Sequence, residues 1–236
     1  MKRNALLTLS ALLVLCLAAC GGNSASTEPA PSAAPSQTVA PADAPEQPKT
    51  QSEPSAPSAD AETVEQSSTI LIAYFSHTGE NYNVGVIDEG NTAKVAKEIA
   101  AQTGGELFEI VTVNAYPEAY EECTDVAMQE QRANARPELA TTLEDISQYD
   151  TIYLGYPIWW GDMPMALYTF LESYDLSGKT VYPFATHEGS GMAGTERKIA
   201  AACSDADVRD GLALRGSTAQ NDAEAVTKAV NDFINK

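Results

Sequence analysis

Between residues 69 and 236, short apolar segments alternate with longer segments whose apolar residues recur every three or four positions. The short segments predict strands at 69–75, 106–113, 151–157, 180–186 and 210–216. The longer segments predict helices at 91–104, within 116–139, and at 164–174, 194–203 and 223–234. The first short segment is apolar on both faces, which is typical of a strand buried in a parallel sheet. Five alternations of strand and helix therefore predict an α/β fold with a doubly wound parallel sheet and one domain over residues 69–236.

The first 68 residues follow a different pattern. Lys2 and Arg3 precede an apolar run that is typical of a secretory signal and too short to cross a membrane. Residues 17–20, Leu-Ala-Ala-Cys, resemble the bacterial lipobox, so we expect a signal peptide at 1–19 and lipidation of Cys20. An ordinary signal peptide cleaved nearby is the alternative. Residues 20–68 are rich in Ala, Pro and Ser, which predicts a disordered tether between an extracytoplasmic membrane anchor and the domain.

Charge and cysteine content restrict the classes of partner. The chain carries a formal net charge of −19, which disfavours nucleic acid because phosphates need cationic contacts. The acidic surface suits a cationic partner, or it serves only to keep the protein soluble. Cys123 and Cys203 lie at helical core spacing and are expected to be buried free thiols, with a disulfide as the alternative. The two histidines and the spread cysteines form no metal-ligand pattern, so we expect no metal.

Three loops that leave predicted strands carry the candidate chemistry, because ligands of such sheets lie at the C-terminal strand ends. The first loop reads Ser-His-Thr-Gly from Ser76 and resumes as Gly-Asn-Thr before the first helix. Hydroxyl groups of Ser76 and Thr78 and the N-terminus of that helix would bind a phosphate without Lys or Arg. Asn91 could also cap that helix.

Residues 80–90 interrupt this loop. We interpret them as an insertion that leaves at a tight turn and returns at the helix N-terminus, so that Ser76, Thr78, Asn91 and Thr92 act together. The alternative is that Glu80 and Asn81 close the phosphate site, while Asn91 and Thr92 only cap the helix.

The second and third loops suit an aromatic ligand. Trp159 and Trp160 follow the third strand and offer planar surfaces for stacking. The third loop, 185–195, contains Thr186, His187 and several glycines, whose exposed amides can bond the edge of a heteroaromatic ring. His187 could alternatively act as a catalytic base, but no nucleophile accompanies it, so we assign no catalytic residue.

Residues 69–236 resemble a flavodoxin-like domain of a bacterial subfamily that carries "AYFS…GNT", "YP.WW" and "THEGSG". The resemblance implies a five-stranded sheet in the order 2-1-3-4-5 between two layers of helices, and one bound FMN. It implies a phosphate site formed by Ser76, Thr78, Asn91 and Thr92. It also implies a flavin site formed by Pro157, Ile158, Trp159, Trp160 and Gly161, with Thr186, His187 and Gly189 at the pyrimidine edge.

The function implied is that of an electron carrier with a redox partner protein, tethered outside the cell membrane. The alternative is an FMN-dependent oxidoreductase of the quinone-reductase type. The third loop lacks the Tyr that often covers the outer flavin face in this family, and an open face would favour the oxidoreductase.

Overall fold

The computed structural model describes residues 69–236, so the predictions for the signal peptide, Cys20 and the tether lie outside the described residues. A central sheet runs in the order β4-β1-β5-β6-β7, and β8 also pairs with β6; every pairing in it is parallel. These strands are β1 (Ile70–Tyr74), β4 (Glu106–Glu109), β5 (Thr151–Pro157), β6 (Thr180–His187), β7 (Asp207–Val208) and β8 (Leu212–Arg215). The predicted α/β fold and strand order are confirmed. The strand predicted at 210–216 corresponds to β8, and β7 lies before the predicted segment, so two short strands share the fifth position of the sheet.

The division of the fifth strand has a local cause. β7 pairs with the first residues of β6, and β8 pairs with its last four residues. Between the two pairings, residues 209–211 face only Tyr182 and Pro183 of β6. One extra residue on the outer strand interrupts the ladder, as in a β-bulge.

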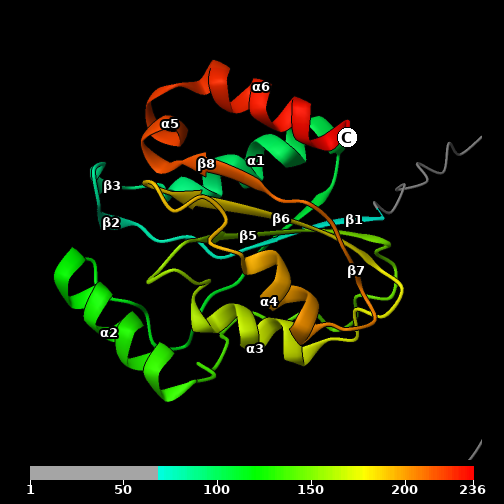
Figure 1. Cartoon of the computed structure of the whole chain (residues 1–236), viewed down its shortest axis with the longest axis horizontal. Helices are drawn as coiled ribbons and strands as arrows, with labels where there is room; N and C mark the ends of the chain where they lie inside the picture. Colours follow the sequence, from blue (N-terminus) through cyan, green and yellow to red (C-terminus); the bar gives the residue numbers. More distant parts are fainter. Residues whose placement is uncertain (1–68) are drawn as a thin grey trace, which may run out of the picture. The chain divides into compact units, whose positions relative to one another are not determined.

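Helices cover both faces of the sheet (Figure 1). One face carries α1 (Asn91–Thr103), α5 (Gly216–Asn221) and α6 (Ala223–Ile234), and the other carries α3 (Met165–Ser173) and α4 (Thr195–Ala202). The helix α2 (Tyr120–Ala133) lies on the second side, toward the end of the sheet where β2 and β3 are found. Side chains alternate between two cores: Leu71 of β1 packs on the α3 side, while the next residue, Ile72, packs on the α1 side.

Three details differ from the sequence-based predictions. β4 ends at Glu109 rather than residue 113, because its neighbour β1 ends at Tyr74, and Thr112 instead forms a bridge with Leu139. The capping role of Asn91 is wrong: the helix begins at Asn91 with Gly90 as its N-cap residue. The insertion folds as an antiparallel hairpin of β2 (Gly79–Asn81) and β3 (Gly85–Ile87).

The cysteines agree with the expectation. Cys123 and Cys203 are buried and free. Burial in apolar surroundings raises the pKa of each thiol to about 11, so both are protonated thiols that pack as small apolar groups. Within residues 69–236, no helix is both long enough and apolar enough to cross a membrane.

Candidate functional site

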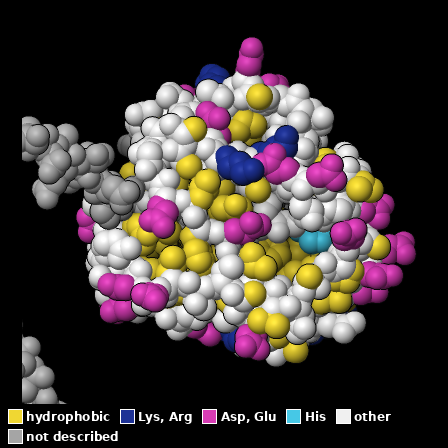
Figure 2. Space-filling view, turned by 180° about the vertical axis from the view of Figure 1, so that it is seen from behind, with side chains coloured by type: hydrophobic (Ala, Val, Ile, Leu, Met, Phe, Trp, Pro, Cys, Tyr) yellow, Lys and Arg dark blue, Asp and Glu magenta, His cyan; other side chains and the backbone are white. Residues whose placement is uncertain are grey.

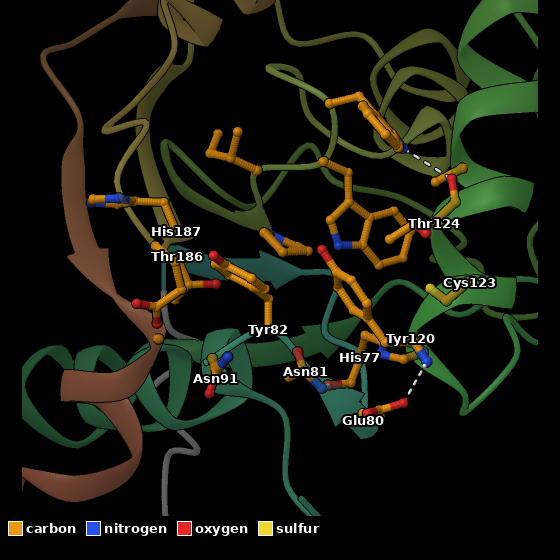
Figure 3. Close-up of a pocket in the computed structure, with 17 residues that line it drawn as sticks. His77, Glu80, Asn81, Tyr82, Asn91, Tyr120, Cys123, Thr124, Thr186 and His187 are labelled. Atoms are coloured by element: carbon orange, nitrogen blue, oxygen red, sulfur yellow. Dashed lines mark hydrogen bonds between the residues drawn. The ribbon is translucent and has the colours of Figure 1, made fainter. Parts of the chain in front are cut away.

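A cavity of about 240 Å³ opens at the C-terminal ends of the central strands (Figure 3). Its walls come from all three loops, from the β2–β3 hairpin and from α2. The predicted residues that line it are Asn91, Pro157, Ile158, Trp159, Trp160, Thr186 and His187. Those absent from the lining are Ser76, Thr78, Thr92, Gly161 and Gly189. The sheet therefore brings the three predicted loops to one place, although not every predicted side chain faces the cavity.

The two halves of the interrupted first loop lie in contact. A Cβ atom at Gly90 would overlap Ser76 Oγ and stand 2.6 Å from the carbonyl oxygen of His77, so only glycine fits there. Ser76 Oγ accepts a hydrogen bond from the Ala93 N–H at 3.0 Å and thus caps α1 from across the insertion. The hairpin leaves and re-enters the loop without separating its ends.

The polar residues of this loop differ in their freedom to bind a ligand. Thr92 is buried, and its Oγ1 lies 2.8 Å from Thr186 Oγ1, a hydrogen bond that ties α1 to β6. Thr78 is exposed. Asn91 lines the cavity, and its Oδ1 is buried without a hydrogen-bond partner among the described residues. A buried polar atom without a partner is costly, and Asn91 is the one residue of the predicted phosphate site that lines the cavity.

The second loop is a tight turn. The N–H of Trp159 donates to the Asp162 carbonyl at 2.8 Å, and the Asp162 N–H donates back to the Trp159 carbonyl at 3.0 Å. Trp160 and Gly161 between them have φ values of 51° and 73°, the positive angles of a two-residue type I′ turn. The Asp162 carboxylate accepts a bond from the Met163 N–H and pairs with Lys198 Nζ at 2.7 Å, which fixes the turn.

This turn sends the two tryptophans in different directions. The Trp159 ring is partly buried and makes edge contacts with Phe75 and Tyr116, at centroid distances of 5.4 and 5.0 Å. The Trp160 ring is 52% exposed, and its Nε1–H donates to the Thr124 carbonyl of α2 at 2.9 Å. Trp159 is therefore the fixed aromatic wall of the cavity, and Trp160 attaches the turn to α2.

Two histidines also line the cavity. His77 Nε2 donates to the Pro117 carbonyl at 2.9 Å, and His187 Nδ1 accepts a bond from the Gly189 N–H at 2.8 Å. Burial lowers the pKa of both imidazoles, and the Arg215 charge lowers that of His187 further. Both side chains are thus neutral hydrogen-bonding groups near pH 7.

Sequence reasoning missed several lining residues, above all Tyr82 of the hairpin, Tyr120 at the start of α2, and Glu188. The signal for Tyr82 was available, since it is the single aromatic residue of the insertion 80–90. Glu188 accepts hydrogen bonds from the backbone N–H and the hydroxyl of Ser217, which ties the third loop to α5.

The residues that line the cavity suit one kind of ligand. One part of the cavity is aromatic, with Trp159, Tyr82 and Tyr120 in its lining. Another part is polar, with Asn91 at the N-terminus of α1, which carries the positive end of the helix dipole. Among the residues that line the cavity, none is Lys or Arg. The arrangement fits a planar heteroaromatic group that carries an anionic tail.

Comparisons with known proteins agree with this geometry. A structure from Bacteroides uniformis assigned as a flavoprotein is 31% identical, covers 71% of this chain and 97% of its own, and superposes with a TM-score of 0.55. A second such structure, from Bacteroides eggerthii, is 30% identical over 71% of this chain and 98% of its own, with a TM-score of 0.54. A search of curated proteins found no match. The family model described as flavodoxin matches residues 69–232, and the chain therefore belongs to the flavodoxin family.

Proposed function

We propose that this protein is an FMN-binding electron carrier, exported and attached to the outer side of the cell membrane through a lipid on Cys20. The observation that carries the proposal is the cavity in which aromatic residues and the N-terminus of α1 meet at the C-terminal strand ends. Family membership and the flavoprotein assignment of the two Bacteroides structures support a flavin as the occupant.

The phosphate would bind at α1. The N–H groups of Asn91 and Thr92 find no acceptor within the described part of the chain, as is usual for the first turn of a helix. These amides and the helix dipole attract an anion, and Ser76 and Asn91 stand beside them. The side-chain Nδ2 of Asn91, a residue that lines the cavity, would donate a hydrogen bond to the phosphate.

The ring would lie against Trp159, with the third loop at its edge. Thr186 and His187 line the cavity there, and the bond from Gly189 to His187 holds the turn of that loop. Bound FMN would supply the redox chemistry.

The charges around the site favour a carrier that meets a protein partner. Glu80 and Glu188 line the cavity, and of these two Glu188 is paired with Arg215 at 3.7 Å. Negative groups beside a poorly solvated pocket disfavour further negative charge on the ligand and lower its reduction potential. Acidic side chains are spread over the surface shown in Figure 2, while Lys and Arg gather in a few places. Such a surface attracts a cationic redox partner by long-range steering.

The test is a titration of the full chain with FMN and with riboflavin, which has the ring but no phosphate. We expect FMN to bind more tightly than riboflavin. Asn91→Ala should weaken FMN binding about tenfold, the equivalent of one hydrogen bond, and leave riboflavin nearly unaffected. Ser177→Ala, which removes a hydroxyl group from an exposed loop elsewhere, is the control. Equal affinities for FMN and riboflavin, or no binding of either, would refute the proposal.

Two further measurements test whether the protein is a carrier and whether it is anchored to the membrane. Steady turnover of NADH with a soluble quinone by the FMN-loaded protein would favour the oxidoreductase over the carrier. Cys20→Ala should move the protein out of the membrane fraction, whereas unchanged fractionation and no lipid label on the unmodified chain would contradict the anchor.

A further inference from the structure

We propose that the β2–β3 hairpin forms a second aromatic wall of the cofactor cavity, with Tyr82 contacting the ring system on the face that Trp159 leaves uncovered. This inference rests on the proposed flavin function. It assigns a role to the insertion that interrupts the first loop, and it names Tyr82 as a residue that sets both the affinity for the ring and its exposure.

The position of Tyr82 carries the proposal. Tyr82 and Tyr120 both line the cavity, and Figure 3 shows their side chains reaching into it. Their rings stack with a centroid distance of 6.0 Å and an interplanar angle of 28°. Tyr82 is 58% exposed and Tyr120 is 36% exposed, so part of each side chain is free for contact with a ligand. A planar ligand in the cavity would cover part of these side chains, because aromatic faces gain from contact with other rings.

Glu80 of the hairpin is hydrogen-bonded to the first residue of α2 and to the segment that precedes this helix. The Glu80 N–H donates to the Glu118 carbonyl at 2.7 Å, and a Glu80 carboxylate oxygen accepts from the Tyr120 N–H at 3.1 Å. The second bond supplies an acceptor for a first-turn amide of α2, which otherwise has no side-chain cap. The same contacts that hold the hairpin thus hold the ring of Tyr120 beside that of Tyr82.

The third loop, residues 185–195, offers no aromatic side chain that could cover the ring system. In residues 185–195 there is no aromatic residue other than His187, whose Nδ1 is engaged by Gly189. The third loop can therefore meet the ligand edge but offers no large planar surface. The hairpin supplies that surface from a different segment of the chain, and it narrows the approach of a second planar reactant to the ring.

The experiment compares Tyr82→Ala, Tyr82→Phe and Val86→Ala in the full chain, each titrated with FMN and with riboflavin while bound-flavin fluorescence is recorded. Val86→Ala is the matched control, because Val86 belongs to the same hairpin but is 79% exposed and does not line the cavity. We expect Tyr82→Ala to weaken both flavins by a similar factor of about ten and to raise the fluorescence of the bound ring. Tyr82→Phe keeps the ring face and should remain within about twofold of the unmodified chain, as should Val86→Ala.

The outcomes separate this inference from the function on which it rests. If Tyr82→Ala weakened the binding of FMN but not that of riboflavin, Tyr82 would act on the phosphate rather than on the ring, and the inference would be wrong. Unchanged affinities in Tyr82→Ala, or an equal loss in Val86→Ala, would overturn it too while the unmodified chain still binds FMN. Failure of the unmodified chain to bind either flavin would instead refute the proposed function.

Discussion

The cavity has two aromatic walls that are built in opposite ways. Trp159 follows a central strand and packs by its edges against Phe75, Tyr116 and His77. Tyr82 lies at the turn of an inserted hairpin, and among residues 69–236 its ring contacts one other aromatic ring, that of Tyr120. One wall is continuous with the hydrophobic core, whereas the other is more than half exposed and is held by the hydrogen bonds of Glu80 with Glu118 and Tyr120.

Because the two walls differ in burial, we expect them to contribute differently to folding stability and to ligand affinity. A side chain packed against the core contributes to folding whether or not a ligand is present, because its burial already exists in the free protein. An exposed aromatic side chain gains most of its contacts when the ligand arrives. Substitutions in the first wall should therefore reduce both stability and flavin binding, and those in the second should reduce binding alone.

The largest effect is expected for Trp159→Ala. It removes three edge contacts and leaves a void beside Phe75. We expect the free energy of unfolding to fall by about 2–3 kcal/mol, below the ~3–5 kcal/mol of a fully buried Trp. Urea denaturation measures this, with Tyr82→Ala as the comparison, for which we expect less than about 0.5 kcal/mol. If both variants lost the same free energy of unfolding, the proposed difference between the two walls would be wrong.

Trp160 allows a sharper comparison within one turn. Trp160→Ala and Trp160→Phe both remove the hydrogen bond from Nε1 to the Thr124 carbonyl. Each should lower the free energy of unfolding by about 1 kcal/mol, the net value of one such bond. A much larger loss in Trp160→Ala than in Trp160→Phe would show that the ring, rather than the N–H group, holds the turn to α2.

The anchoring of the hairpin can be tested at Glu80. Glu80→Gln keeps an acceptor for the Tyr120 N–H but removes the charge at the N-terminus of α2, which should cost about 0.3–1 kcal/mol. The effect should weaken with added salt. Glu144→Gln removes the same charge from an exposed residue and should cost less. If the two variants lose equal stability, Glu80 does not support α2.

The smallest effect concerns pH and His77, which contacts Trp159. Burial lowers the His77 pKa in the folded protein below the ordinary value of a histidine, about 6.5, so near and below that pH the unfolded chain binds more protons than the folded one. This component of stability is present above the unfolded pKa and is lost as the pH falls. From about pH 7.5 to about pH 5.5 the unmodified chain should lose more stability than His77→Gln. Parallel pH profiles in denaturation experiments would contradict this.

Much of the fold was predictable because it rests on local patterns. The apolar strands and amphipathic helices gave the element order, and the rule that ligands bind at C-terminal strand ends placed the three loops together. The division of the last strand was not predictable, since one extra residue opposite Tyr182 and Pro183 leaves no mark in the hydrophobic pattern. The cap of α1 was assigned wrongly because the side chain that caps it, Ser76, comes from the far side of the insertion.

The sequence by itself determined the α/β fold, the strand order through its family resemblance, and the loops that form the cavity. Only the tertiary structure decided how individual side chains act within those loops. It pairs Thr92 with Thr186, directs Trp159 and Trp160 to different neighbours, and brings Tyr82 into the cavity. The physical reason is that periodicity records which face of an element is buried, whereas side-chain partners depend on contacts between segments far apart in the chain.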